Sequence, residues 1–309
     1  MTNDADTQTL TPDAAMPMFD CKLLERFEHL SLLARRSGGR SLLAAPRRKI
    51  PGGGAELGGV RDYVAGDDYR YVNWTWCARR DELLTRTFEG DEDLHCYVLL
   101  DCSPSMGNGS PAKFDLARRI AAALAYLAVT NLDRLSVSVF SGGIVSEGPP
   151  VRHAARLPRL LRFLEGLSPR GTETDLTGTA EAFVRRYQRH GPVVVISDLY
   201  DRNGFGRCFD ILRHRGYEPR LVQIHETAEI EPGLLGDIEL LDVESRAVRR
   251  VTVTERAVRR YHELVAEFRR SVCDYCRRNT IDYMQIASDA VEDEVLLSVL
   301  GARPRHGNA

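Results

Sequence analysis

The chain has 309 residues, enough for one large α/β domain and a smaller appendage, and 43% of them are hydrophobic, as in proteins with a sizeable core. Its net charge of −2 gives no general attraction to nucleic acid or anionic membranes. Because no apolar run approaches the roughly 18 residues of a membrane span and the polar, acidic start is unlike a signal peptide, we expect a cytoplasmic protein. Seven scattered cysteines, an odd number, indicate reduced thiols.

The first third of the chain divides into a polar tail, a helix and a β-rich region. Residues 1–18 are polar, and we expect them to be mobile. Apolar residues at three- and four-residue steps predict an amphipathic helix over about 19–36, followed by a basic, glycine-rich loop. This loop is either solvated and flexible or a patch for a phosphate or a partner. Short β-prone pieces between turns over 56–95 predict a small sheet or hairpin outside the main fold.

Charged residues in the β-rich region accompany its two tryptophans. The set Arg61, Asp67, Asp68, Arg70 and Arg79 is typical of an ion-pair network. A turn with paired arginines accounts for both aspartates, and a catalytic role for them is the alternative.

From residue 96 onward, strand and helix patterns alternate. Continuous apolar runs at 97–100 and 192–196 predict central strands that are covered on both faces. The other expected elements are strands at 134–140, 143–151 and 219–225 and helices beginning near 114, 157, 176 and 206. This alternation predicts an α/β fold with a doubly wound, mostly parallel sheet, helices on both faces and right-handed crossovers.

The last quarter predicts a mixture of strands and helices. In order, these are a hairpin of strands at 237–243 and 250–254, a long helix, a strand at 281–286 and a terminal helix at 292–300. Arginines on the polar side of the long helix indicate a solvated face or, alternatively, a docking surface. Cys273 and Cys276 are spaced like a zinc-binding pair, but a zinc site needs two more ligands and the pair falls within the helical pattern.

The strand at 97–100 ends in an oxygen-rich turn. Asp101, Ser103 and Ser105 place a carboxylate and two hydroxyls at alternate positions of one short loop. Ligands bind beside the carboxyl ends of strands in open α/β sheets, so this loop lies where a site is expected. Its oxygens favour Mg²⁺, Mn²⁺ or Ca²⁺, whereas Zn²⁺ would call for His or Cys. Alternatively, these side chains cap the next helix.

Two later segments add oxygen-bearing loops to the first one. They are a Gly-Thr-x-Thr loop at 171–174 and a strand that ends in Ser-Asp at 197–198. Together the three segments resemble the von Willebrand factor A domain and its metal-ion-dependent adhesion site. The metal ligands that this resemblance implies are Asp101, Ser103, Ser105, Thr174 and Asp198. It implies direct coordination by both serines and frequent coordination through water by the aspartates, and Thr172 is the alternative to Thr174.

A second group of residues precedes the first central strand. It comprises Gly-x-Arg-x-Tyr at 59–63, Gly-Asp-Asp-x-Arg at 66–70, Trp74 and Ala-Arg at 78–79. The group resembles the hallmark of domain of unknown function family 58, a bacterial and archaeal family, and the similarity covers roughly residues 20–303. This resemblance implies a von Willebrand A-like core and a gene commonly found beside ATPases of the MoxR type. Some members are membrane-anchored, and this chain shows no such segment.

These patterns divide the chain into four parts. We expect a mobile tail over 1–18 and a helix, basic loop and small β subdomain over 19–94. A von Willebrand A-like core follows over 95–230, and a hairpin, long helix, strand and terminal helix complete the domain over 231–309. The expected architecture is a doubly wound core with an N-terminal β-containing appendage and a C-terminal α+β extension.

The leading hypothesis for function is a non-enzymatic, metal-dependent binding module. A cation held by three loops keeps an open coordination position, which an acidic side chain of a partner protein can fill. The family resemblance implies a MoxR-type AAA+ ATPase, or a client protein delivered to it, as the partner. The chain would then act as an adaptor in the assembly or maturation of another complex.

Two other interpretations of the same residues stay open. One is a metal-dependent phosphatase or hydrolase, although that chemistry needs a cationic clamp and the nearest lysine, Lys113, starts a helix and has no evident role. The other is a metal-free site whose hydroxyls and carboxylates bond to one another. No Walker A pattern is present in the sequence, so we do not expect the chain to hydrolyse ATP itself.

Overall fold

A computed structural model describes most of the chain. The described residues are 18–19, 21–36, 41–43, 50–51, 56–64, 72–74, 77, 83–89, 94–109, 112–171, 173–230, 232, 235–241 and 248–301. Several sequence predictions concern residues outside this description. They are the tail over 1–17, most of the basic loop, the charged residues Asp67, Asp68, Arg70 and Arg79, and the alternative ligand Thr172.

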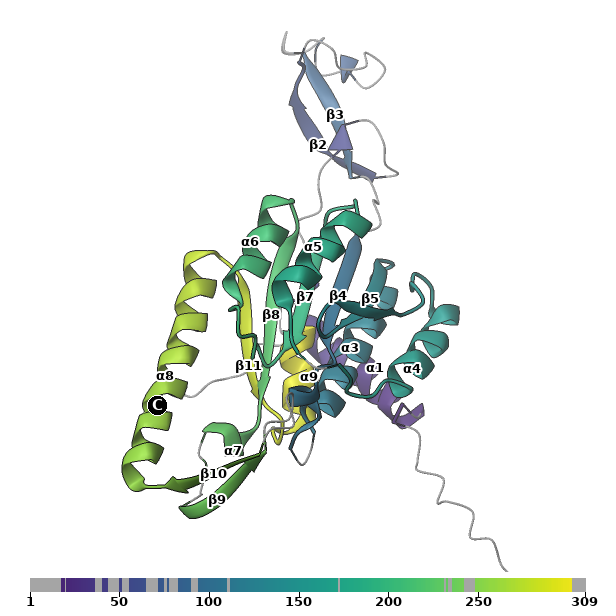
Figure 1. Ribbon diagram of the computed structural model, residues 1–309. Helices are drawn as coiled ribbons and strands as arrows, with labels where there is room; N and C mark the ends of the chain where they lie inside the picture. The colour runs from purple at the N-terminus through teal and green to yellow at the C-terminus, as the bar shows by residue number, and fades with distance from the viewer. Residues whose placement is uncertain are drawn as a thin grey trace, which may run out of the picture.

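A six-stranded sheet in the order β11-β8-β7-β4-β5-β6 forms the centre of the molecule (Figure 1). Its strands are β4 (His95–Asp101), β5 (Arg134–Phe140), β6 (Ile144–Glu147), β7 (Pro192–Ser197), β8 (Glu218–His225) and β11 (Asp282–Ala287). All neighbours are parallel except β6, which runs antiparallel to β5. The chain leaves β4 toward β5 and later returns to β7 on the other side of β4. The doubly wound, mostly parallel α/β sheet predicted from the sequence is therefore confirmed.

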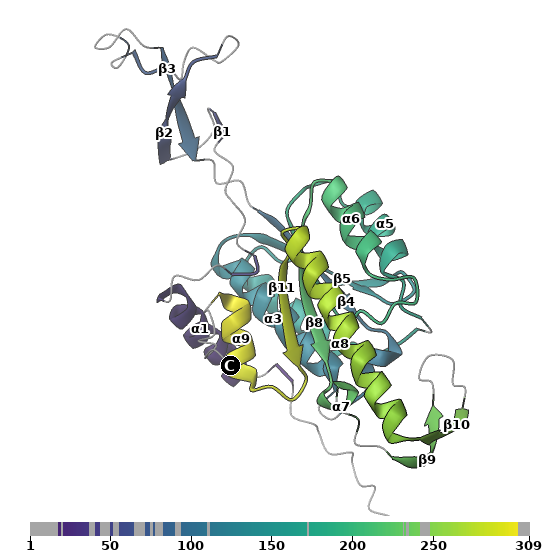
Figure 2. The same ribbon diagram turned by 90° about the vertical axis from the view of Figure 1, so that its left-hand side faces the viewer.

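Helices cover both faces of the sheet (Figure 2). One apolar core contains residues of α1 (Cys21–Arg36), α3 (Lys113–Thr130), α4 (Leu157–Glu165) and α9 (Glu292–Leu300). The other contains residues of α5 (Leu176–Arg186), α6 (Gly206–His214) and α8 (Glu255–Arg278). Along β4, Val98 and Leu100 belong to the first core, while Tyr97 and Leu99 belong to the second. Because successive side chains of a strand point to opposite faces, a strand between two cores needs an unbroken apolar run.

Two further β units lie outside the central sheet. The strands β1 (Ile50–Pro51), β2 (Glu56–Asp62) and β3 (Leu84–Glu89) form an antiparallel sheet in the order β1-β3-β2. The strands β9 (Gly236–Leu241) and β10 (Val248–Val253) form an antiparallel hairpin between the short helix α7 (Thr227–Ile230) and α8. Figures 1 and 2 show these two units near opposite ends of the central sheet, with the hairpin and α7 at the same end.

The structure differs from the predicted elements in small ways. The predicted edge strand at 143–151 is shorter, because β6 ends at Glu147 and Pro149 and Pro150 lack the N–H groups that a strand ladder requires. The long helix and the hairpin are confirmed. None of the described helices is both long enough and apolar enough to cross a membrane.

Candidate metal centre

Three loops that carry the predicted ligands lie at the carboxyl end of the central strands. Asp101 ends β4 and Asp198 directly follows β7, and these two strands are parallel neighbours. The third loop precedes α5 and contains Thr174. In a doubly wound sheet, the crevice between the two strands at which the strand order reverses is the usual ligand site. The topology thus brings two of the predicted ligands to neighbouring strand ends.

The first loop holds its oxygens in a fixed arrangement. One carboxylate oxygen of Asp101 accepts the Ser103 N–H at 2.8 Å, and the other accepts the Ser197 hydroxyl at 2.5 Å. The hydroxyl oxygens of Ser103 and Ser105 lie 3.0 Å apart. The alternative that these side chains cap the next helix is wrong, because Ala112 is the N-cap of α3 and Ser103 makes no side-chain cap bond to the following 3₁₀ turn, Pro104–Gly107.

The loop containing Thr174 is bonded to both of its neighbours. The Arg170 N–H donates to the Cys102 carbonyl at 2.7 Å, which joins this loop to the first one. The Leu176 N–H donates to Asp201 at 2.8 Å, which joins it to the loop after β7. Asp175 caps α5 through the Gly178 N–H. These bonds fix Thr174 between the two neighbouring loops.

The hydroxyl of Thr174 has an unusual environment. Its oxygen is buried and has no hydrogen-bond partner among the described parts of the chain. Buried polar atoms in native proteins are nearly always paired with protein or with an ordered ligand or water. The missing partner is therefore a sign that this oxygen serves a ligand.

On the opposite side of the site, Asp198 is paired with a lysine. Both side chains are almost completely buried, and Lys113 Nζ lies 2.8 Å from Asp198 Oδ2. The same ammonium lies 2.5 Å from Glu229 Oε1 in α7 and 5.2 Å from the centre of the Tyr200 ring. The other oxygen of Asp198 accepts the Tyr200 N–H at 3.2 Å. Between these two residues, Leu199 has a φ of 65°, a left-handed conformation that turns the chain sharply after β7.

The sequence interpretation that gave Lys113 no role is wrong. Lys113 is the first residue of α3, and a cation there opposes the positive end of the helix dipole. A lysine in that unfavourable position was a local signal that carboxylates lie nearby. Nothing local identified its partners, since Asp198 and Glu229 are 85 and 116 residues away.

The electrostatics of the site follow from burial of its charges. Burial, and then the charge of Asp198, raise the pKa of Asp101 to about 7. Burial alone would lower the pKa of Lys113, but the charges of Asp198 and Glu229 outweigh it and raise that pKa. The ammonium is therefore charged, and it compensates part of the carboxylate charge of the site.

The oxygens of the predicted ligands are of the kind that suits a hard divalent cation. They comprise the hydroxyls of Ser103, Ser105 and Thr174 and the carboxylates of Asp101 and Asp198, which is the kind of donor set that Mg²⁺, Mn²⁺ and Ca²⁺ prefer. Within the described ranges, no three His, Cys, Asp or Glu side chains gather as a metal cluster. The zinc alternative at Cys273 and Cys276 therefore gains no support, and burial raises the pKa of Cys276 to about 12.

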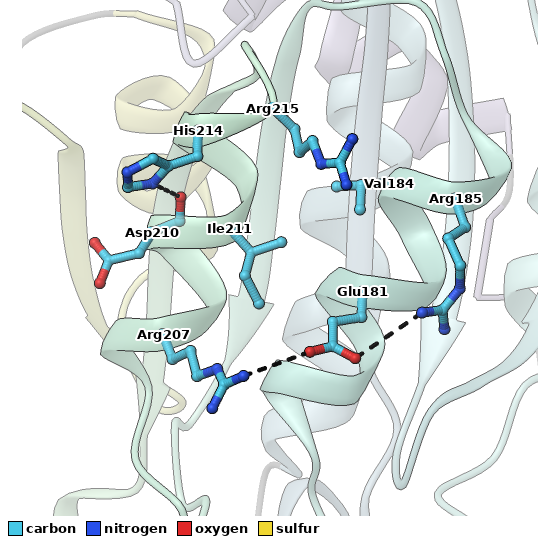
Figure 3. Close-up of a pocket in the computed structure, with 8 residues that line it drawn as sticks. All are labelled: Glu181, Val184, Arg185, Arg207, Asp210, Ile211, His214 and Arg215. Carbon is cyan, nitrogen blue, oxygen red and sulfur yellow. Dashed lines mark hydrogen bonds and ion pairs between the residues drawn. The ribbon is translucent and has the colours of Figure 1, made fainter.

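A surface groove lies between α5 and α6, away from the predicted ligands (Figure 3). Its volume is about 430 Å³. The two carboxylate oxygens of Glu181, which lines the groove, form ion pairs with Arg185 Nη1 at 3.9 Å and with Arg207 Nη2 at 3.8 Å. Both arginines are largely exposed, so these pairs contribute little. None of the predicted ligands lines this groove.

Comparison with known proteins places the chain in a family. The model of the family described as "Protein of unknown function DUF58" matches residues 59–271. The uncharacterized protein Rv1480 of Mycobacterium tuberculosis is 29% identical over 208 residues, which are 66% of this chain and 65% of that protein. The alignment thus covers slightly less than two thirds of the relative's length.

Solved structures that align with this chain have low sequence identity and TM-scores below 0.5. A conserved hypothetical protein, BatB from Bacteroides thetaiotaomicron, aligns with 67% of this chain and 97% of its own at 13% identity and a TM-score of 0.44. Proximal thread matrix protein 1 from the mussel byssus, in a form with a zinc-occupied MIDAS motif, aligns with 67% of this chain and 47% of its own at 12% identity and a TM-score of 0.41. The DUF58 family model matches more than half of this chain, and the chain therefore belongs to the DUF58 family.

Proposed function

We propose that this protein is a non-enzymatic, metal-dependent protein-binding module. The observation that carries the proposal is the buried, unpartnered hydroxyl of Thr174, on a loop that is hydrogen-bonded to the loops of Asp101 and Asp198. An oxygen in such a place has no partner in the fold as described, and a bound cation would supply one.

In this proposal, five side chains hold the cation. Ser103, Ser105 and Thr174 would contribute hydroxyl oxygens, and Asp101 and Asp198 carboxylates, directly or through water. The proposed ion is Mg²⁺, with Mn²⁺ or Ca²⁺ as substitutes, because these ions prefer oxygen ligands. A bound divalent ion supplies a concentrated positive charge that an acidic side chain of another protein can contact.

The surroundings of Lys113 favour binding over phosphoryl transfer. A phosphatase would need a cationic clamp that reaches the substrate. Lys113 is fully buried and already pairs with Asp198 and Glu229, so its charge is occupied within the protein.

The proposed partner is a MoxR-type AAA+ ATPase or a client protein that it acts on, in the cytoplasm, with this chain as the adaptor. This part rests on the family resemblance and on the chemistry of an acidic contact. The adaptor would release its partner when the metal is removed, because the contact depends on the charge of the ion.

Two measurements test the proposal. Electron paramagnetic resonance with Mn²⁺ should detect binding to the wild-type chain and to the control Asp274→Ala, which removes an exposed carboxylate. Binding should be lost in the double variant Asp101→Ala with Ser103→Ala. A purified MoxR-type ATPase should then be captured in Mg²⁺ and released by a chelator. Absence of Mn²⁺ binding would contradict the proposal as a whole. Mn²⁺ binding without capture of the ATPase would exclude only the MoxR-type ATPase as the partner.

A further inference from the structure

A partly apolar pocket lies beside the candidate metal centre. It has a volume of about 210 Å³ and lies between α8, the short helix α7 and the strands β8 and β11. Its apolar lining includes Ile230, Leu264, Val265 and Phe268. Figure 2 shows α8 lying along β11 and β8, with α7 near the first turns of the helix.

The pocket exists because the apolar face of α8 extends beyond the core. Near the end of the helix, Val272 and Cys276 are buried against the sheet. Nearer its start, Tyr261 is 40% exposed and Leu264 is 48% exposed. Large apolar side chains that line an open pocket gain free energy when a partner removes them from water.

Shared residues connect the pocket with the metal centre. The Tyr200 N–H donates to Asp198, while the Tyr200 side chain lines the pocket. The Tyr261 hydroxyl donates to the carbonyl of Glu229, whose carboxylate holds Lys113. The pocket therefore adjoins the loop that carries Asp198.

Polar groups in the pocket favour a peptide over a purely apolar ligand. Arg269 Nε and Nη2 both donate to the side-chain oxygen of Gln285, at 3.2 and 3.0 Å. The buried Nδ1 of His225 has no hydrogen-bond partner among the described residues. The His225 nitrogen needs a hydrogen-bonding partner, and Gln285 accepts from only two of the five N–H groups of Arg269. A peptide backbone brings partners for such groups and a hydrocarbon does not.

We propose that this pocket receives a bulky apolar side chain of a partner's peptide segment, next to an acidic residue that contacts the metal. The inference rests on the proposed function and adds the sequence preference of the partner. A dry cavity of about 150 Å³ holds benzene, so the larger volume here admits a leucine or aromatic side chain.

The test uses a library of random linear peptides displayed on phage. The full chain is panned in Mn²⁺, and phage are released first with a chelator and then with acid. The chelator fraction should be enriched in sequences with Asp or Glu close to Leu, Phe, Tyr or Trp. A synthetic peptide from that fraction should bind Leu264→Ser about 10-fold more weakly than wild type, since burial of a leucine contributes about that factor.

A matched control is available on the hairpin. Leu240 is 47% exposed, almost the same as Leu264, and does not line the pocket. Leu240→Ser should bind the peptide as wild type does. Both variants change an exposed leucine, so neither is expected to unfold the chain.

Each other result decides between the two proposals. One result is that the chelator-released peptides show no apolar preference and bind Leu264→Ser and Leu240→Ser equally well. It would overturn the proposal for the pocket and leave the proposal for the metal site intact. Apolar peptides that are released only by acid and bind Asp101→Ala as they bind wild type would overturn the proposed link between the pocket and the metal, while the Mn²⁺ measurement decides the metal site itself. Failure to enrich any peptide would overturn the pocket proposal. Self-association that Leu264→Ser abolishes would show that a second copy of this chain is the occupant.

Discussion

On the β4 side of the candidate metal centre, the oxygens come from the continuous stretch 101–105, whereas on the β7 side Asp198 is surrounded by groups from distant segments. The serine hydroxyls on the first side bond to each other. On the second side, a carboxylate oxygen already faces the ammonium of Lys113, which also pairs with Glu229. The β4 side can offer oxygens to a cation, whereas the β7 side already contains a cation, the ammonium of Lys113. Metal binding therefore has to overcome the charge of Lys113 at Asp198.

The largest expected effect is that of Lys113→Met. It leaves the carboxylates of Asp198 and Glu229 without their cation, and loss of one partner of a buried ion pair costs about 3–5 kcal/mol of unfolding free energy. Denaturant unfolding in a chelator should show this loss. Mg²⁺ or Mn²⁺ should recover part of it and should bind more tightly than to wild type, because a repulsive charge is gone.

The control for this variant is Lys22→Met, which removes an exposed lysine of α1. It should change neither stability nor metal affinity appreciably. Weaker metal binding by Lys113→Met would contradict the view that Lys113 opposes metal binding at Asp198. It would mean instead that Lys113 holds Asp198 in place for the ion.

On the other side of the site, Asp101→Asn should separate stability from metal binding. Burial and Asp198 raise the pKa of Asp101 to about 7, so its charge is unfavourable in the metal-free fold. We expect stability in a chelator to change by about 1 kcal/mol or less, the scale of one hydrogen bond. Mn²⁺ affinity, measured by titration calorimetry, should fall about 100-fold, at the upper end of the losses caused by changes around metal ligands. A large loss of metal-free stability would show that this carboxylate is structural.

A smaller effect is expected for Thr174→Val, which removes a hydroxyl and keeps the shape of the side chain. Its oxygen has no partner in the described structure, so unfolding in a chelator should be unchanged, while Mn²⁺ affinity should fall about 10-fold. Thr179→Val is the matched control, since that buried hydroxyl donates to the Asp175 carbonyl at 2.7 Å. The control should lose about 1 kcal/mol of stability and keep its metal affinity. Lower stability of Thr174→Val with unchanged Mn²⁺ affinity would exclude Thr174 as a ligand.

Local patterns in the chain were enough to predict the central sheet and the positions of its oxygen-rich ends. The apolar run at 97–100 could be interpreted because a strand between two cores must be apolar on both faces. The spacing of Asp101, Ser103 and Ser105 could be recognised because those residues share one loop. The ligand assignment itself stays a prediction until metal binding is measured.

The sequence by itself determined the order of strands and helices, since hydrophobic periodicity depends only on neighbouring residues. Tertiary structure alone decided which groups surround the predicted ligands. The pairing of Lys113 with Asp198 and Glu229 and the unpartnered Thr174 hydroxyl result from packing of separate loops at one sheet edge. The pocket beside them likewise depends on where α8 leaves the core, because burial of an amphipathic face is set by the surface it packs against.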